Sequence, residues 1–297
     1  YKRQNNKRGK IMSADKMLKT ISDESVEYVD IRFTDPRGKL QHVTVMADQV
    51  DSDFIDEGFM FDGSSIAGWK SIEASDMKLM IDTDSAYVDP FYAEKTLCVH
   101  CSVVEPDTGE AYERDPRGTA EKAEAYLKSS GVGDVAYMGP EAEFFLFDNV
   151  KFSNEMNKVS FEVDALDAAW NTDTDYEMGN TGHRPGVKGG YFPVNPIDDG
   201  QDIRSEMLST MKRLGMKVDK HHHEVASCQH ELGLIFNSLT KQGDELQKYK
   251  YVIHNVAQAY GKSATFMPKP VAGDNGTGMH VNMSIWKGGK PLFAGDK

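Results

Sequence analysis

Two glutamates lie two residues apart in the stretch Gly139-Pro-Glu-Ala-Glu-Phe-Phe-Leu-Phe-Asp148. On a β-strand, Glu141 and Glu143 share one face with Phe145 and Phe147, because alternate side chains point to the same side. Carboxylates beside large aromatic side chains are costly to bury unless a cation neutralises them. The stretch therefore predicts either a divalent-metal site or a strand end whose acids face water while the phenylalanines point inward.

A second run of potential metal ligands is His221-His-His-Glu-Val-Ala-Ser-Cys-Gln-His-Glu231. On a strand, His222 and Glu224 point to one side, and the two flanking histidines point to the other. Glu224 and Glu231 are an odd number of residues apart, so an unbroken strand would place them on opposite faces. If both serve one site, the chain must turn within residues 227–229. Adjacent histidines also occur in metal-chelating patches and tags, but a mid-chain position argues against a tag.

A glycine-rich segment leads into a strictly alternating strand in Gly273-Asp-Asn-Gly-Thr-Gly-Met-His-Val-Asn-Met-Ser-Ile-Trp286. His280, Asn282 and Ser284 share one face of that strand, and apolar side chains line the other. Glycines allow backbone amides to approach an anion closely. The polar face would add a metal ligand and hydrogen-bonding groups. The alternative is a loop that leads into an amphipathic surface strand.

A fourth stretch, Phe61-Asp62-Gly-Ser-Ser65, displays an acid, although alone it predicts only a solvated turn. Together the four stretches supply mostly carboxylates and one or two histidines, a ligand set that suits Mg²⁺ or Mn²⁺ better than structural zinc. Two such ions suit phosphoryl transfer, because they hold phosphates and neutralise the charge that develops. The sequence contains neither a P-loop nor a GxGxxG motif, so a nucleotide must be bound by other means.

The chain that positions these residues has 297 residues and a formal net charge of −13. Residues 1–11 hold five Lys/Arg and no acid, and Met12 follows them, so we interpret them as a non-native or disordered leader. The net charge of −13 argues against nucleic acid as a partner. The sequence shows neither an apolar run near the ~18 residues of a membrane span nor a signal peptide. We therefore expect no membrane association and a cytoplasmic location.

The three cysteines do not suggest a disulfide framework. Cys98 and Cys101 form a CxxC pattern, but the strand predicted over residues 96–104 would point them to opposite faces. The sequence also lacks a second CxxC to complete a zinc site. We interpret these cysteines as reduced, packed side chains.

The N-terminal part of the sequence is rich in predicted strands. A β-hairpin is expected over residues 27–50 and a further extended region over 77–104. The polar stretch 105–117 is the best candidate boundary between domains. Strands first and mixed elements later predict an α+β fold, with a small β-domain at 12–113 and an α+β body at 114–297.

The second part alternates helices with strands. Asp115-Pro116 and Gly131 have the residue types that begin and end a helix. Further helices are expected over about 202–214 and 243–260. Strands are expected over 135–148, 217–226, 231–237 and 278–286, and residues 149–185 are predicted to be rich in loops.

Six motifs are similar, in order, to those of bacterial type I glutamine synthetases. They are Asp62-Gly-Ser-Ser, Glu141-Ala-Glu-Phe-Phe, Gly182-His-Arg-Pro with Gly189-Gly-Tyr-Phe-Pro, His221-His-His-Glu-Val, Phe266-Met-Pro-Lys-Pro and Gly273-Asp-Asn-Gly-Thr-Gly-Met-His. The resemblance covers about residues 13–297. It implies a β-grasp domain followed by an incomplete α/β-barrel catalytic domain, in a dodecamer of two stacked rings whose sites are shared between adjacent subunits.

The family joins ammonia to glutamate after ATP has phosphorylated the γ-carboxylate. By resemblance, Glu143, Glu224 and Glu231 would hold a first metal ion, and Glu141 with His280 a second one near the ATP phosphates. Asp62, from a neighbouring subunit, would bind ammonium and help to remove its proton. The remaining expected contacts are Asn275 and Gly276 with substrate glutamate, and His222, Phe236 and Ser284 with ATP.

Three features depart from the family pattern. Glu224 and Glu231 are seven residues apart, where some members have eight. Asn282 stands where many members have histidine, which puts that nucleotide contact in question. Family members also continue well past the position of Lys297, so we expect the missing part to hold the third ligand of the second metal. We therefore predict that residues 1–297 alone do not turn over.

Two other readings remain open. A sister ligase would join glutamate to a polyamine or another amine, but Asp62 in its Asp-Gly-Ser-Ser setting favours the small ammonium ion. A non-catalytic relative could keep the fold as a structural protein, although five side chains of metal-binding type argue against that.

Overall fold

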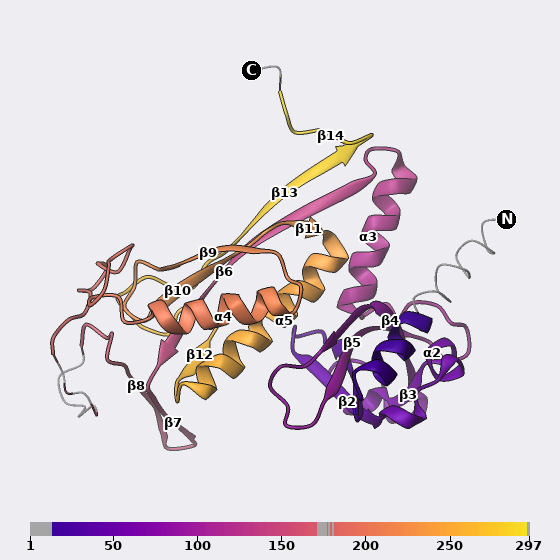
Figure 1. Cartoon of the computed structure of the whole chain (residues 1–297), viewed down its shortest axis with the longest axis horizontal. Coiled ribbons are helices and arrows are strands. Elements are labelled where there is room, and N and C mark those ends of the chain that lie inside the picture. Colours follow the sequence, from indigo (N-terminus) through magenta and orange to yellow (C-terminus); the bar gives the residue numbers. More distant parts are fainter. Residues whose placement is uncertain (1–13, 171–176, 178, 180, 296–297) are drawn as a thin grey trace. The chain divides into compact units, whose positions relative to one another are not determined.

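The computed structural model describes residues 14–170, 177, 179 and 181–295, so the predicted leader at 1–11 lies outside the described residues. The chain forms two compact units (Figure 1). Unit 1 contains the described residues up to Ala136, together with Leu239–Asp244 and Trp286–Lys290. Unit 2 contains Tyr137–Ser238, Glu245–Ile285 and the described residues from Pro291 onward. The domain limits expected at 12–113 and 114–297 stay predictions.

Unit 1 is built on a five-stranded sheet with the order β2-β1-β5-β4-β3. Its strands are β1 (Tyr28–Thr34), β2 (Leu40–Met46), β3 (Phe59–Asp62), β4 (Asp76–Val88) and β5 (Thr96–Val104). β1 and β2 form an antiparallel hairpin, whereas β1 and β5 run parallel. The hairpin expected over 27–50 and the extended region expected over 77–104 are thus confirmed.

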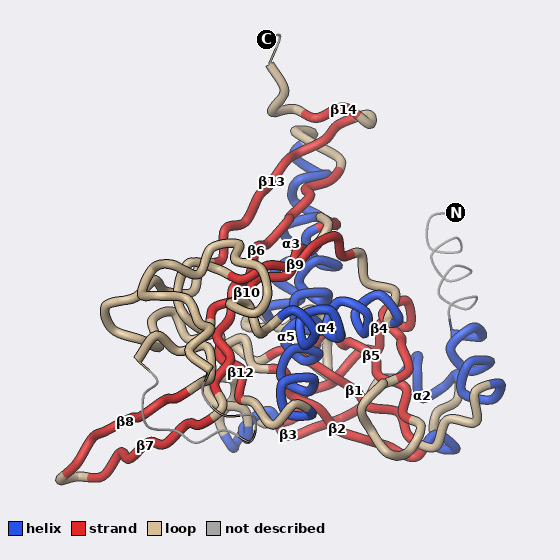
Figure 2. Tube along the Cα trace, turned by 60° about the vertical axis from the view of Figure 1, so that its left-hand side comes forward, coloured by secondary structure: helices blue, strands red, loops and turns tan. Residues whose placement is uncertain are grey.

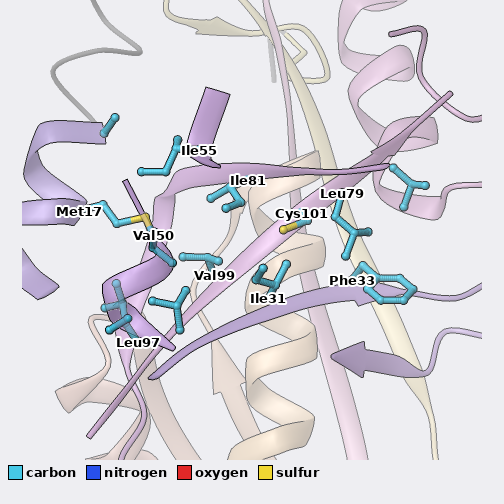
Figure 3. Packing of buried hydrophobic residues seen from close by; sticks show 14 of the residues in the cluster. Met17, Ile31, Phe33, Val50, Ile55, Leu79, Ile81, Leu97, Val99 and Cys101 are labelled. Carbon is cyan, nitrogen blue, oxygen red and sulfur yellow. The ribbon is translucent and has the colours of Figure 1, made fainter. Parts of the chain in front are cut away.

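The core of unit 1 lies where apolar side chains from the central strands meet those of the short helices. Ile31, Ile81 and Val99 come from β1, β4 and β5, and Met17 and Ile55 come from helical segments (Figure 3). Burying each such side chain contributes about 1.5–3 kcal/mol. Helical and 3-10 segments are residues 14–23, η1 (Ala47–Gln49), α2 (Ser52–Glu57), η2 (Gly63–Ser65), η3 (Ile72–Ala74) and α3 (Pro116–Ser130).

Helix α3 begins and ends where its sequence predicts. The Asp115 side chain accepts hydrogen bonds from the backbone amides of Arg117 and Gly118, and Pro116 occupies the first turn. Gly131 follows the last turn with a φ of 71°, a left-handed conformation that glycine adopts without strain.

A second sheet carries the residues of the predicted site. Its strand order is β14-β13-β6-β10-β9, with β11 and β12 also paired to β6. The strands are β6 (Val135–Phe147), β9 (Val218–His223), β10 (Gln229–Leu234), β11 (Asn237–Ser238), β12 (Ser263–Thr265), β13 (Met279–Lys287) and β14 (Lys290–Pro291). The helices are α4 (Gln201–Arg213), which packs on β9 and β10, and α5 (Leu239–Ala259). Figure 2 shows both helices against these strands.

Three boundaries differ from the sequence expectation. The segment 149–185, expected to be loop, begins with a regular hairpin of β7 (Asn149–Glu155) and β8 (Lys158–Asp164). This hairpin extends away from the rest of unit 2 (Figures 1 and 2). β9 ends at His223 and β10 begins at Gln229, which leaves a turn between them. α5 begins at Leu239, four residues before its expected start. Within the described residues, no helix is long and apolar enough to span a membrane.

Candidate metal centre

The β9–β10 hairpin brings three potential metal ligands together. Glu231 on β10 lies directly opposite His222 on β9, so their side chains share one face. Glu224 follows β9 and lies on the same side as His222. The ligand atoms of His222, Glu224 and Glu231 all lie within 4.8 Å of one another. The two ring nitrogens of His222 lie 3.5 Å from Glu224 Oε1 and 3.7 Å from Glu231 Oε2.

A tight turn makes this arrangement possible, as the odd spacing of the two glutamates required. The Glu224 backbone amide donates to the Gln229 carbonyl at 2.8 Å, and the Gln229 amide donates to the Ala226 carbonyl at 3.3 Å. Cys228 adopts a positive φ of 65° at the reversal. Its backbone amide donates to Asp167 Oδ2 at 2.5 Å, which fixes the turn from outside the hairpin. The prediction that the chain turns within residues 227–229 is confirmed.

The three adjacent histidines have three different surroundings. His221 accepts a hydrogen bond from Arg204 Nε at 3.1 Å, and burial followed by this arginine lowers its pKa. His223 lies 2.8 Å from Asp167 Oδ2 and donates to the Glu224 carbonyl at 2.6 Å. Burial alone would lower the pKa of His223, but the bond to Asp167 and its charge raise it. Only the middle histidine therefore faces the glutamates, as strand alternation predicts.

Glu143 on β6 completes the group of acids. The side chain of Gln229, which the sequence did not indicate as a site residue, holds Glu143 in place. The buried Gln229 amide donates to Glu143 Oε2 at 2.5 Å and to the Gly276 carbonyl at 2.9 Å. The Gln229 side-chain oxygen accepts from the Ala226 amide at 3.0 Å, which fixes the orientation of the amide group. The backbone amide of Gly278 also donates to Glu143 Oε2, at 2.8 Å. Glu143 is thus directed toward the hairpin from two elements.

The pKa shifts in this group indicate that its carboxylates are crowded together. Burial raises the pKa of Glu231 to about 7, and the charges of Glu224, Glu141 and Glu143 add to the shift. Burial and then Glu224 raise the pKa of Glu143, while His280 acts in the opposite direction. The charge of Lys220 acts in the opposite direction on Glu231, but among the described residues the ion pairs of these four glutamates are with histidine and not with lysine or arginine. We call the four residues of this group the glutamate cluster: Glu141, Glu143, Glu224 and Glu231.

A cavity of about 510 Å³ adjoins the glutamate cluster. Glu141 and Glu231 line it, as do Phe236 and Ser284, two of the residues expected to contact ATP. The Phe236 ring meets the Tyr137 ring edge to face, with centroids 5.2 Å apart. His222, the third expected ATP contact, is not among the lining residues and lies instead between two carboxylates. The cavity therefore combines aromatic faces with carboxylates.

The glycine-rich segment lies against the same turn, and Asp274 fixes it there. This buried carboxylate accepts hydrogen bonds from the backbone amides of Lys188 and Ser227, both at 3.2 Å. Lys188 Nζ in turn donates to Asn275 Oδ1 at 2.8 Å. The structure thus places Asn275 and Gly276 beside the turn that carries Glu224. The sequence alone does not indicate this role for Asp274.

Asp62, the predicted ammonium-binding residue, lies in unit 1 at the end of β3. Its carboxylate accepts hydrogen bonds from the Ser64 hydroxyl at 2.6 Å, the Ser64 amide at 2.8 Å and the Ser65 hydroxyl at 2.7 Å. The bonds from Ser64 and then Ser65 lower the pKa of Asp62. An exposed carboxylate of this kind stays ionised, so it can attract a cation but is a weak proton acceptor.

Comparison with known proteins assigns the family. The glutamine synthetase β-grasp domain matches residues 25–106, and the glutamine synthetase catalytic domain matches residues 113–297. The chain belongs to the glutamine synthetase family. Its order of a β-grasp domain followed by a mixed α/β catalytic domain with curled sheets confirms the expected fold class.

Similar glutamine synthetases are found in several bacteria. That of Cereibacter sphaeroides is 75% identical over 280 residues, 94% of this chain and 60% of the relative. That of Rhodobacter capsulatus is 74% identical over 95% of this chain and 64% of the relative. That of Rhizobium meliloti is 59% identical over 96% of this chain and 61% of the relative. The chain thus spans about 60% of the length of these glutamine synthetases.

Solved structures agree in fold. Plasmodium falciparum glutamine synthetase, determined by cryo-EM, superposes with a TM-score of 0.89 at 26% identity, over 96% of this chain and 56% of that one. A GmaS–ADP complex superposes with a TM-score of 0.74 at 23% identity, over 95% of this chain and 58% of that one. At that identity the second likeness is one of fold.

One departure from the glutamine synthetase pattern has a visible consequence. Asn282 on β13, which replaces the histidine of many members, donates from Nδ2 to Glu141 Oε1 at 3.0 Å. The same nitrogen lies 3.5 Å from the Gly139 carbonyl. Asn282 therefore fixes the Glu141 carboxylate from the neighbouring strand.

Proposed function

We propose that this chain carries most of the active site of an ATP-dependent ligase that forms glutamine from glutamate and ammonium. The observation that supports this most strongly is the glutamate cluster beside a cavity of about 510 Å³ that also has an aromatic wall. Crowded, partly buried carboxylates with no lysine or arginine in ion-pair contact among the described residues favour binding of an external cation. A cavity lined by both carboxylates and aromatic rings suits a nucleotide bound together with metal ions.

The residues present fit a divalent cation of the Mg²⁺ or Mn²⁺ type. Glu143, Glu224 and Glu231 would hold one ion and Glu141 with His280 a second, with His222 close enough to Glu224 and Glu231 to join the first set. Oxygen-rich sites with one imidazole are typical of these metals. When bound, such ions supply charge neutralisation to the phosphates and to the carboxylates alike.

The proposed reaction has two displacements. An oxygen of the substrate γ-carboxylate attacks the terminal phosphorus of ATP, and ADP leaves. Ammonia then attacks the acyl carbon of γ-glutamyl phosphate, inorganic phosphate leaves, and one proton of the original ammonium is released. Asn275 and Gly276 would position glutamate, while Phe236 and Ser284 would contact the nucleotide within the cavity.

Asp62 would attract the ammonium ion of a neighbouring subunit's site in the proposed dodecamer. Its lowered pKa supports the cation-binding part of this role, because the carboxylate stays ionised at neutral pH. Asp62 would also help to remove the proton of the bound ammonium. A cytoplasmic location, like the dodecamer, stays a prediction.

The proposal is tested by assaying the full-length gene product with ATP and glutamate. Ammonium should support product formation with Mg²⁺ or Mn²⁺, and putrescine should not. Glu224→Gln should abolish metal-dependent turnover, whereas Glu57→Gln, a change of an exposed glutamate on α2, should leave it unchanged. Turnover with putrescine alone would favour the amine ligase, and wild-type rates in Glu224→Gln would refute the metal assignment. The same assay on residues 1–297 tests their predicted inactivity.

A further inference from the structure

The ladder between β6 and β10 stops at the glutamate cluster. Gln229, His230 and Glu231 pair in register with Phe145, Phe144 and Glu143. One step earlier, the Leu146 amide donates to the Cys228 carbonyl at 2.9 Å. Because hydrogen-bonded pairs recur at every second position of an antiparallel ladder, the next such pair would be Leu232 with Ala142.

The hydroxyl group of Tyr249 occupies the place of that missing rung. Tyr249 belongs to α5 and is fully buried. Its Oη donates to the Ala142 carbonyl at 2.6 Å and accepts from the Leu232 amide at 3.3 Å. The oxygen also lies 3.4 Å from the Leu232 carbonyl. The direct backbone bond is thus replaced by a bond through one side-chain oxygen, which holds the two strands further apart.

The strands separate immediately beyond this point. They pair again only where Asn237 and Ser238 of β11 meet Met138 and Tyr137 of β6. Between the two paired regions, residues 232–236 face residues 139–142, so one side has an additional residue. The cavity of about 510 Å³ is lined by residues from both sides of this opening, including Gly139, Glu141 and residues 233–236.

The Tyr249 hydroxyl lies among the residues of the proposed metal site. Ala142 stands between Glu141 and Glu143, and Leu232 directly follows Glu231. Burial raises the pKa of Tyr249, and the charges of Glu231 and Glu143 raise it further. The hydroxyl therefore stays protonated and remains a donor to Ala142.

We propose that Tyr249 is a positioning residue, whose hydroxyl sets the separation of the strands that carry Glu141, Glu143 and Glu231. This role rests on the proposed function, because the carboxylates are taken to hold metal ions. A purely structural role would lower stability without changing metal binding. A positioning role changes metal affinity while the fold is kept, since groups that orient metal ligands typically alter affinity about 10–100-fold when removed.

The test compares Tyr249→Phe with a matched variant in the full-length gene product. Tyr112→Phe removes a similar buried bond, donated to the Trp69 carbonyl at 2.9 Å in unit 1. Mn²⁺ titration should show an increase in Kd of about tenfold for Tyr249→Phe, the lower end of such effects. Tyr112→Phe should bind Mn²⁺ as the wild type does, and circular dichroism should show both variants folded.

Glu231→Gln separates this proposal from the function on which it rests. Unchanged Mn²⁺ binding in Glu231→Gln refutes the metal site itself. Lost binding in Glu231→Gln, together with wild-type binding in Tyr249→Phe, overturns the role of Tyr249 alone. An equal loss in Tyr112→Phe and Tyr249→Phe overturns it as well.

A measurement on the wild type covers the case in which Tyr249→Phe does not fold. Bound Mn²⁺ should slow hydrogen exchange in a peptide spanning residues 229–234, because an ion held by Glu143 and Glu231 opposes the transient opening that would free the Leu232 amide from Tyr249. Exchange in that peptide that is insensitive to bound Mn²⁺ also overturns the proposal.

Discussion

In unit 1, two buried aspartates lie on either side of one arginine. Arg32 donates from Nε to Asp30 Oδ2 at 2.6 Å and from Nη2 to Asp89 Oδ2 at 3.1 Å. Asp30 also receives bonds from His42 and Thr44 at 2.6 and 2.7 Å. Burial alone would raise the pKa of Asp30, but these bonds lower it. The chain itself supplies a cation and hydrogen-bond donors to this group.

In unit 2, the glutamate cluster has the opposite character. Burial and the neighbouring glutamates raise the pKa of Glu231 and that of Glu143, and within the described part of the chain the ion pairs of the cluster are with histidine. The two groups show that the surroundings of buried carboxylates indicate whether they serve structure or binding. Acids that share a buried arginine, such as Asp30 and Asp89, belong to the architecture. Acids that are crowded together with no lysine or arginine in ion-pair contact among the described residues, such as Glu224 and Glu231, indicate an external cation.

The largest expected effect comes from removing the cation of unit 1. Arg32→Met removes the arginine that both buried carboxylates share, which should lower the free energy of unfolding by about 3–5 kcal/mol. Arg213→Met is the matched control, because Arg213 pairs with Glu206 at 3.1 Å on the exposed surface. Arg213→Met should lower the free energy of unfolding by less than about 1 kcal/mol. Urea titration of both variants measures the difference, and equal losses would contradict the comparison.

The next largest effect is that of Glu231→Gln on the free energy of unfolding, and its sign should change when metal binds. In metal-free protein, Glu231→Gln removes one crowded charge and should raise the free energy of unfolding by about 1 kcal/mol, the scale of one destabilised ionised group. With Mn²⁺ at about a hundred times its Kd, the wild type gains about 2.7 kcal/mol that the variant lacks. Thermal unfolding with EDTA and with Mn²⁺ should therefore rank the two proteins in opposite orders.

Asp89→Asn is the control for this reversal. Removing an acid from the neutralised group of unit 1 should lower the melting temperature whether or not Mn²⁺ is present. A metal-dependent change of sign in Asp89→Asn, or a constant sign in Glu231→Gln, would show that the two groups of carboxylates do not differ as inferred.

Local signals explain how much of the fold the sequence predicts. The hairpin of β1 and β2 alternates regularly, and α3 has both a capping aspartate and a terminal glycine, so short-range chemistry defines both. The β7–β8 hairpin was missed although Val150, Phe152 and Phe161 alternate, because the surrounding residues are polar and these side chains are exposed. The start of α5 was also missed, since Ser238 makes no side-chain capping bond.

The candidate site likewise has features that the sequence predicts and features that it does not. Strand alternation placed His222 with Glu224, and an odd spacing required the turn before Glu231. Gln229 and Tyr249 were not predicted, because their roles depend on partners 86 and 107 residues away in the sequence. Single-sequence patterns indicate which side chains share a face, whereas the groups that orient them come from tertiary packing.

A smaller effect tests how unit 1 stabilises Asp30. Thr44→Val removes a hydrogen bond to this carboxylate and should cost about 1 kcal/mol at neutral pH. The folded pKa of Asp30 lies below its ordinary value of 3.8, so the contribution is present above that pH and is lost as the pH falls. Urea titrations should show the difference between variant and wild type shrinking below about pH 4.

Thr20→Val is the control for this pH dependence. The Thr20 hydroxyl donates to the Lys16 backbone carbonyl at 3.0 Å on the exposed surface, and not to a carboxylate. Its cost should be the same at every pH. A Thr44→Val cost that is also constant through the acid range would show that Thr44 does not act on the ionised form of Asp30.

The smallest expected effect concerns the cysteine beside this group. Cys98 Sγ lies 3.6 Å from Asp89 Oδ2, and burial followed by the nearby aspartates raises the pKa of its thiol. Burial outweighs the opposing charge of Arg32 on this thiol, so iodoacetamide should not modify Cys98 in the native protein. All three buried cysteines should react after urea unfolding. Rapid native modification of Cys98, read by mass spectrometry, would mean that Arg32 carries uncompensated charge and that unit 1 is not self-neutralised.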